Sequence, residues 1–209
     1  MPVRPEVVDD WVRGWTVSRG TSAPVAVPDG YRIDVGRPGH LVRYVVPRFD
    51  PERLRRLAGP LTGPGTWLKL FADPADVLAA LPDGWKEDAP GFMMTAALRT
   101  AEIAPPDGYS LSVVEEDGVL RAAVRTGNGL VAARGQAGLA GDVAVMDQIE
   151  TDPAHRRRGL GGLVMTALGH GAALRGVGRG VLGATVEGRA LYLSLGWEEH
   201  SPLVSVYRP

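Results

Sequence analysis

The sequence predicts an α/β protein in which a mixed β-sheet carries helices on its faces. Three observations support this prediction. Of the 209 residues, 44% are hydrophobic and 22% are charged, a composition typical of a folded globular chain. Short apolar runs bounded by Gly, Pro and Asp alternate with segments of helical periodicity along the chain. In the second half these segments follow the order of four strands, helix, strand, helix, strand, which implies a mixed sheet.

In the first half, Pro5 at a first helical position and apolar residues at helical spacing predict a helix that ends near Gly20. Two more helices are indicated by Asp-Pro pairs at Asp50 and Asp73, because an aspartate side chain caps the first turn of a helix. The expected strands are residues 31–35, 41–46, 67–71 and 92–98.

The second half begins with three short apolar runs separated by Gly118 and by Gly127-Asn-Gly129, which predict an antiparallel meander. A fourth strand then leads through an arginine- and glycine-rich turn into an amphipathic helix. A strand, a helix over residues 188–195 and a final strand close the chain. The expected strands of this half are residues 109–114, 119–126, 130–134, 143–151, 181–185 and 203–207.

Two short sequence matches link the halves. Pro28-Asp-Gly-Tyr31 is repeated at Pro106-Asp-Gly-Tyr109. In both halves an expected strand and an expected helix are followed by a Gly-Trp pair, at Gly84-Trp85 and at Gly196-Trp197. The second pair of matches lies farther apart by about the length of the strand, turn and helix in residues 142–175. We therefore hypothesise that the first half is a degenerate copy that lacks this unit. The alternative is that short turn signals recur by chance.

Composition excludes several classes of protein. The formal net charge is −1, from 23 Lys and Arg against 24 Asp and Glu, which argues against a nucleic-acid or anionic-membrane partner. The absence of cysteine excludes disulfides, thiol nucleophiles and cysteine-bound metals. No two of the four histidines are spaced as metal ligands, so we expect no metal. The polar first ten residues and the lack of an apolar run of ~20 residues predict a cytoplasmic protein.

The turn after the strand at 143–151 has the chemistry of a pyrophosphate site. Its glycines, Gly159, Gly161 and Gly162, let the backbone approach a ligand. They lie at the start of a helix, whose first N–H groups lack intrahelical partners and whose dipole favours an anion. Three arginines precede them. The turn lacks both the Gly-Lys-Ser/Thr of a nucleoside triphosphate loop and the last glycine of a dinucleotide fingerprint.

Two motifs in the second half resemble those of a known family. Arg156-x-x-Gly159-x-Gly161 resembles the acyl-CoA signature of the GCN5-related N-acetyltransferases, the GNAT superfamily. The later block Ala184-Thr-x-x-Gly-x-Ala-Leu-Tyr192-x-x-Leu-Gly-Trp197 resembles the segment on the thioester side of the site. The resemblance covers about the last 100 residues. It implies the mixed-sheet GNAT acyl-CoA N-acyltransferase fold, with residues 101–209 as the acetyltransferase domain. Together with the internal sequence matches, it makes residues 1–100 a degenerate GNAT-like region.

The resemblance also implies a donor site. Backbone groups of Ile149, Glu150 and Thr151 would pair with the pantetheine arm, and a bulge would splay their strand from the one at 181–185. The pyrophosphate would lie against the turn, with backbone N–H groups from Arg157 onward and charge from the arginines. A solvated surface arginine is the alternative for each arginine. The residues of the turn are Arg156, Arg157, Arg158, Gly159, Leu160, Gly161 and Gly162.

The catalytic candidates are a tyrosine and two carboxylates. The resemblance implies that Tyr192 protonates the departing CoA thiolate, and a packing tyrosine is the alternative. Asp147 and Glu150 are candidates for the general base, because the attacking amine must be neutral. Strand alternation places these two carboxylates on opposite faces unless a bulge intervenes. A salt bridge to an arginine is the alternative for Asp147.

The sequence thus predicts an N-acetyltransferase that moves an acetyl group from acetyl-CoA to a primary amine of a small molecule or peptide, by direct attack in a ternary complex. One alternative is a non-catalytic acyl-CoA sensor, and another is a transferase with a different acyl donor. The first half has no Arg-x-x-Gly-x-Gly turn, so we expect it to bind no CoA, to pack against the second half and to wall the acceptor cleft. The protein is expected to be a monomer or a homodimer.

Overall fold

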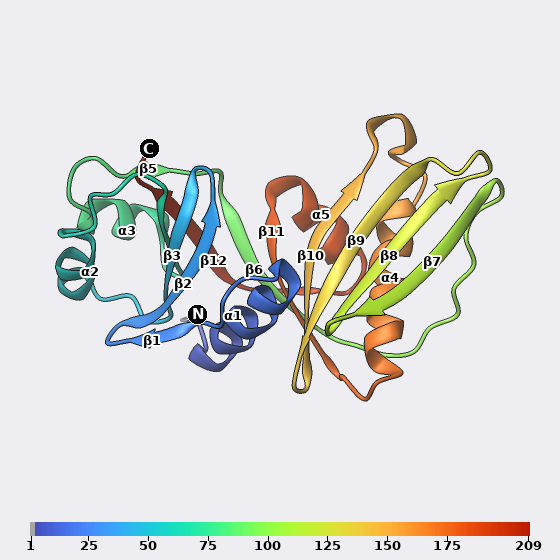
Figure 1. Cartoon of the computed structure of the whole chain (residues 1–209), viewed down its shortest axis with the longest axis horizontal. Helices are drawn as coiled ribbons and strands as arrows, with labels where there is room; N and C mark the ends of the chain where they lie inside the picture. The colour runs from blue at the N-terminus through green and yellow to red at the C-terminus, as the bar shows by residue number, and fades with distance from the viewer. Residues whose placement is uncertain (1–2) are drawn as a thin grey trace.

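The computed structural model describes residues 3–209, which form one extended β-sheet with helices on both faces (Figure 1). The strands are β1 (Val25–Val27), β2 (Gly30–Arg37), β3 (His40–Val46), β4 (Thr66–Leu70), β5 (Lys86–Glu87), β6 (Gly91–Ala97), β7 (Tyr109–Glu116), β8 (Val119–Thr126), β9 (Val131–Ala140), β10 (Val143–Thr151), β11 (Arg179–Thr185) and β12 (Glu198–Tyr207). The helices are α1 (Pro5–Arg19), α2 (Pro51–Ala58), α3 (Pro74–Ala80), the 3₁₀ turn η1 (Pro153–His155), α4 (Leu160–Ala173) and α5 (Val186–Ser194).

The helix boundaries follow the residues that predict them. α1 ends at Gly20, whose φ of 59° is the left-handed conformation that glycine adopts readily. The Asp50 side chain accepts a hydrogen bond from the Arg53 N–H at 2.9 Å and so caps α2. The Asp73 side chain caps α3 in the same way, through the Ala75 N–H. The predicted α/β class, the helices and the strand order of the second half are confirmed.

The strand order shows that the two halves share the sheet. It runs β1-β2-β3-β4-β12-β6-β11-β10-β9-β8-β7, with β5 beside β12. β6, the last strand of the first half, lies between β11 and β12 and is antiparallel to both. β12 pairs with β6 over its first part and with β4 from Val204 to Tyr207. Each half therefore supplies its last strand to the other half's part of the sheet.

The first half contains a strand–helix–strand unit, so the hypothesis that it lacks one is wrong. β3 and β4 are parallel and are joined through α2, as β10 and β11 are parallel and joined through α4. The first half is shorter for two other reasons. Only β1 and β2 precede its parallel pair, whereas three strands precede β10. The connection from β3 to its helix is residues 47–50, whereas residues 152–159 connect β10 to α4.

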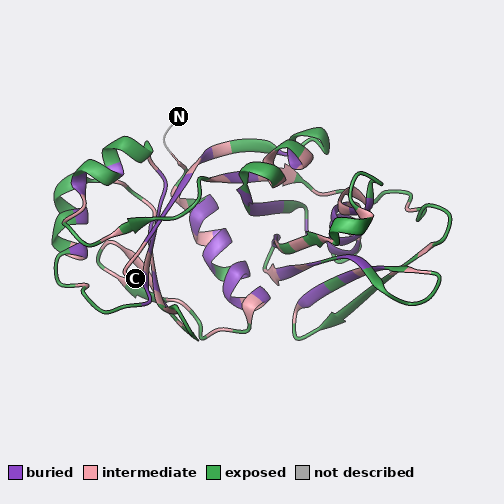
Figure 2. Cartoon of the chain, turned by 90° about the horizontal axis from the view of Figure 1, so that it is seen from above, coloured by how far each residue is buried: buried purple, intermediate pink, exposed green. Residues whose placement is uncertain are grey.

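α1 packs between the two halves (Figure 2). Its apolar side chains, with Val8 and Val12 fully buried, share one cluster with residues of β2 and β3 on one side and of β10 and β11 on the other. Gly14 permits the close packing, because a Cβ atom there would lie 2.3 Å from Val145 Cγ2. α4 covers the opposite face of β8, β9 and β10. Among residues 3–209, each helix is too short or too polar to cross a bilayer.

Candidate functional site

β10 separates from β11 partway along its length. The parallel pairing runs from Val143 opposite Arg179 to Met146 opposite Leu182 and then stops. At the same point the register against β9 shifts between Asp147 and Glu150, a β-bulge. Gln148 forms the bulge with a φ of 54°. The bulge that the resemblance implied is therefore present, and it falls where the two strands diverge.

Beyond the bulge, β10 offers one unpaired edge. Ile149, Glu150 and Thr151 stay in register with β9, with Glu150 opposite Arg134 and Thr151 opposite Ala133. Toward β11, no strand among residues 3–209 pairs with this segment. The backbone groups on that edge can therefore accept an extended ligand as if it were a strand.

The turn that follows presents a row of free backbone donors. Arg157 has a φ of 61° and Gly159 a φ of 76°, so the chain curls before α4 begins. The first hydrogen bond of the helix runs from the Leu163 N–H to the Gly159 carbonyl, at 3.0 Å. Within residues 3–209, the backbone N–H groups of residues 157–162 have no hydrogen-bond acceptor. Consecutive free N–H groups at a helix start form a concave site for an anion.

Gly161 lies where this turn approaches β10 and α5. A Cβ atom at this position would lie 3.1 Å from Leu191 Cδ2 of α5 and 3.4 Å from Thr151 Oγ1 of β10. A larger side chain would therefore extend into the space between β10 and α5. Gly162 is less restricted, because a Cβ atom there would lie 3.6 Å from Leu195 Cδ2.

Two arginines of the turn stabilise its conformation through hydrogen bonds to neighbouring groups. Arg158 Nη1 donates a hydrogen bond to the Tyr109 hydroxyl at 3.0 Å, and that hydroxyl lies 2.9 Å from His155 Nδ1. Arg156 Nε donates to the Thr151 carbonyl at 3.4 Å. Tyr109 begins β7, far from the turn in sequence, so sequence reasoning missed this contact. Its only signal is the repeated Pro-Asp-Gly-Tyr segment, which reads as a turn.

Tyr192 lies on α5 with its ring packed in the core. The side chain is 8% exposed, and its ring centroid is 6.2 Å from that of Trp197. Burial raises the pKa of the Tyr192 hydroxyl to about 12, and the negative charge of Asp147 adds to the effect. No hydrogen bond to this hydroxyl forms within residues 3–209. Tyr192 is thus both a packing residue and a phenol that keeps its proton at neutral pH.

The bulge places Asp147 and Glu150 on the same face of the sheet. Asp147 accepts two hydrogen bonds from Arg19, one of them from Nη2 at 2.8 Å, and a third from Ser18 Oγ at 2.9 Å. Its side chain is 12% exposed. Glu150 accepts hydrogen bonds from Arg134 Nε and Nη2 at 3.0 and 2.7 Å and is 57% exposed. The salt-bridge alternative for Asp147 is therefore present in the structure, and only Asp147 lies partly buried at the divergence of the strands.

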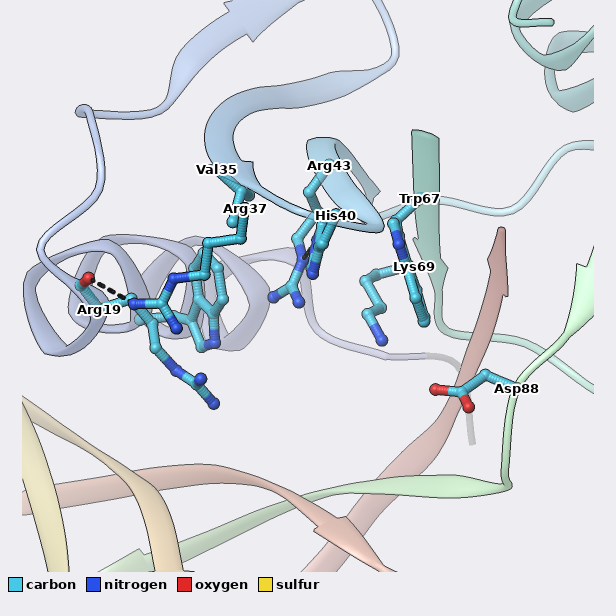
Figure 3. Close-up of a pocket in the computed structure, with 9 residues that line it drawn as sticks. Arg19, Val35, Arg37, His40, Arg43, Trp67, Lys69 and Asp88 are labelled. Carbon is cyan, nitrogen blue, oxygen red and sulfur yellow. Dashed lines mark hydrogen bonds between the residues drawn. The ribbon is translucent and has the colours of Figure 1, made fainter. Parts of the chain in front are cut away.

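A cavity of about 210 Å³ lies beside this site, between α1 and strands β2 to β4 (Figure 3). Arg19 lines it and at the same time holds Asp147, so the cavity adjoins the bulge. Sequence reasoning missed this cavity, because its residues come from four separate elements and two of its tryptophans looked like core positions. The lining residues are Trp15, Arg19, Val35, Arg37, His40, Arg43, Trp67, Lys69 and Asp88.

Comparisons with known proteins support the fold. No protein-family model matches the sequence, and no curated protein matches it either. Among solved structures, a GCN5-related N-acetyltransferase from Kribbella flavida is similar over 100% of this chain and 96% of its own, with 18% identity and a TM-score of 0.69. A putative GNAT-family acetyltransferase from Novosphingobium aromaticivorans is similar over 99% of both chains, with 20% identity and a TM-score of 0.64.

A third similar structure is a tandem GNAT protein from the clavulanic acid biosynthesis pathway. It matches 67% of this chain and 63% of its own length, with 15% identity and a TM-score of 0.50. The first two structures match along essentially the whole chain, including residues 1–100, where no GNAT motif is visible in the sequence. The chain therefore has the fold of the GCN5-related N-acetyltransferases, the GNAT fold, over its whole length.

Proposed function

We propose that the protein is an acyl-CoA-dependent N-acyltransferase that moves an acetyl group from acetyl-CoA to a primary amine of a small molecule or peptide. One observation carries this proposal. The unpaired edge of β10 after the bulge leads directly to the free N–H groups of residues 157–162. An extended arm that ends in a pyrophosphate fits these two features in that order, and acetyl-CoA has such an arm.

The donor site assigns a role to each part of the turn. The N–H groups of Arg157, Arg158, Gly159, Leu160, Gly161 and Gly162 would bind the pyrophosphate oxygens. Arg156 and Arg158 would add positive charge while they hold the turn in shape. Ile149, Glu150 and Thr151 would pair through their backbones with the pantetheine arm.

The reaction needs a neutral amine, an electrophilic thioester and a proton for the leaving sulfur. The amine nitrogen attacks the thioester carbonyl, and the carbon–sulfur bond breaks as the amide forms. Tyr192 would give its proton to the thiolate, since the phenol is protonated at neutral pH and so has a proton to donate. Both carboxylates are paired with an arginine, and Asp147 is the better placed to take the proton of the amine because it lies partly buried where β10 and β11 diverge. The chain has no cysteine that could form a thioester acyl-enzyme, and direct attack by the amine needs no such intermediate.

The two parts of the chain would bind different substrates of the reaction. Residues 101–209 would be the GNAT acetyltransferase domain, and residues 1–100 a degenerate GNAT-like region that binds no CoA. The connection from β3 to α2, Pro47-Arg-Phe-Asp50, contains no glycine and begins with a proline that lacks an N–H donor. This region would instead form the acceptor side of the site, because residues of β2, β3 and β4 line the cavity that Arg19 also lines.

The test combines binding with turnover. Calorimetry with CoA should give one site per chain, and a panel of primary amines with acetyl-CoA should give turnover of at least one amine. CoA binding without turnover of any amine would favour the sensor alternative. Turnover with propionyl-CoA or longer donors but not acetyl-CoA would favour the alternative of a different acyl donor. An absence of CoA binding would refute the proposal.

A further inference from the structure

The cavity between α1 and strands β2 to β4 is lined by an excess of positive charge. Arg19, Arg37, Arg43 and Lys69 line it from α1, β2, β3 and β4, and the Arg37 guanidinium donates a hydrogen bond to the Arg19 carbonyl at 3.4 Å (Figure 3). Asp88 is the only carboxylate among the lining residues. Asp147 offsets one of these charges, that of Arg19, from outside the cavity. The cavity therefore presents a net positive surface in a protein whose total charge is −1.

Arg43 and Lys69 are buried cations without a carboxylate partner. They are 6% and 9% exposed, and neither forms an ion pair within residues 3–209. Arg43 Nε donates a hydrogen bond to His40 Nε2 at 3.3 Å, and its guanidinium lies 3.8 Å from the centre of the Trp15 ring. Lys69 Nζ donates one hydrogen bond, to Ser205 Oγ at 2.6 Å. The remaining donors of both groups have no protein acceptor.

Burial of unpaired cations opposes folding, because each loses its hydration without gaining an opposite charge. The pKa values reflect this cost. Burial and the neighbouring Arg43 charge lower the pKa of Lys69 to about 7, and burial lowers the pKa of Arg43 to about 9. His40 is kept neutral, since burial and the same cations lower its pKa to about 3. An anion among these cations would lower the cost, because it would supply the missing opposite charge.

We propose that this cavity binds the anionic group, a carboxylate or a phosphate, of the acceptor amine. The proposal rests on the proposed function, because it assigns the cavity to the acceptor of that reaction. Arg19 supports the assignment, since it lines the cavity and holds Asp147 at the point where β10 and β11 diverge. An acceptor anchored by its anion in the cavity would extend its amine toward this point. Polyamines and other purely cationic acceptors would be repelled by the same charges.

The size of the cavity agrees with a small head group. Its volume of about 210 Å³ is comparable to the ~150 Å³ that holds a benzene-sized ligand. The cavity thus fits an oxyanion and the few carbon atoms next to it, and the rest of the acceptor would extend toward the divergence of β10 and β11.

The first experiment measures anion binding without any turnover. The melting temperature of the full chain is followed against inorganic phosphate and, separately, against acetate. The melting temperature should rise by roughly 3–5 °C for each tenfold increase in the preferred anion above its Kd. Lys69→Met should abolish this response and should raise the melting temperature of the anion-free protein, because it removes a buried unpaired charge. Arg55→Gln, which removes an exposed charge on α2, should leave the response unchanged.

The phosphate response must also be separated from binding at the Arg156–Gly162 turn. Gly161→Val alters that turn and not the cavity, so it should retain the response that Lys69→Met loses. An anion response that persists in Lys69→Met, or a lower melting temperature of that variant without anion, would overturn the proposal. The anion with the larger response identifies the head group as a phosphate or a carboxylate.

The second experiment uses turnover. Lys69→Met should raise the KM for amines that carry a carboxylate or phosphate by about 10- to 100-fold, as expected for the loss of a charged hydrogen bond. The KM for the same amines with the anion capped as an amide should not change. Equal effects on both amine sets would overturn the proposal while the proposed function stands. Anion binding in the cavity without acetyl transfer to any amine would instead refute the proposed function.

Discussion

Arg19 and Asp147 form an ion pair that joins the end of α1 to the bulge of β10. Arg19 Nη2 donates to Asp147 Oδ1 at 2.8 Å, and Arg19 Nε donates to the other carboxylate oxygen. The two residues are 128 positions apart in the sequence. The pair therefore fixes the N-terminal helix against the strand that carries the proposed donor site.

Replacement of Asp147 tests its assignment as the general base. Asp147→Asn should lower kcat by about 10²- to 10⁴-fold, as expected for the loss of a general base. Arg19→Gln provides the comparison, because it breaks the same ion pair and keeps the carboxylate; since Arg19 also lines the cavity, kcat is compared at saturating acceptor. If both variants lose the same activity with the same pH profile, Asp147 is a structural partner of Arg19.

Gly161→Val tests the donor site. The added side chain would extend toward Leu191 and Thr151, into the space that the pantetheine arm would occupy. We expect CoA affinity to fall below detection by calorimetry, with the far-UV circular dichroism of the wild type. Gly178→Val is the matched control, since no atom lies within 4 Å of a Cβ placed there. A folded Gly161→Val protein that binds CoA normally would contradict the assignment.

Tyr192→Phe separates proton donation from packing. The variant keeps the ring against Trp197 and removes only the hydroxyl, so we expect unchanged acetyl-CoA affinity and a kcat lower by about 10²- to 10⁴-fold. Single-turnover kinetics with saturating acetyl-CoA would show it. A drop in melting temperature with normal turnover per folded molecule would instead identify Tyr192 as a packing residue alone.

The stability of the anion-free protein should rise with pH above neutrality. The pKa of Lys69 is lowered from its ordinary 10.5 to about 7, so between these values the unfolded chain binds more protons than the folded chain. The free energy of unfolding therefore increases as the pH rises from 7 toward 10. The charges that face Lys69 are Arg43, Arg19 and Asp88, and the lowered pKa of Arg43 acts in the same direction above pH 9.

Urea denaturation at pH 7 and pH 9 in a buffer without oxyanions measures this effect. The wild type should show the larger free energy of unfolding at pH 9, and Lys69→Met should lose most of the difference. A Lys69→Met protein with the full pH dependence of the wild type would place its origin elsewhere.

A chain that begins at Asp107 should aggregate. It lacks α1, which covers β10 and β11, and β6, which lies between β11 and β12. Val143, Val145 and Val181, all at most 2% exposed, would face solvent. Size-exclusion chromatography of the shortened chain checks this prediction. A monomeric, fully active product would show that the first half has no structural role in the second.

The local elements could be predicted from the sequence, and their long-range pairing could not. Asp-Pro caps, glycine turns and alternating apolar runs identify nearly every helix and strand, because each signal acts within a few residues. The place of β6 between β11 and β12 depends on which edges meet in space, and no local pattern encodes it.

The same limit applies to the site. The glycine turn and Tyr192 lie in contiguous motifs, so the sequence identifies them as candidates. Arg43 and Lys69 are single cations on two strands, and only the fold shows that both are buried around one cavity.

The exchange of last strands has a consequence for synthesis of the protein. β6 ends at Ala97, and its two neighbours in the sheet begin at Arg179 and Glu198. While the ribosome adds the residues between, the edges of β6 and β4 stay open to other chains. Such long-range pairing slows folding and prolongs exposure of strand edges. Neither half can complete its part of the sheet before β12 has left the ribosome, so we expect the two halves to complete their folding together.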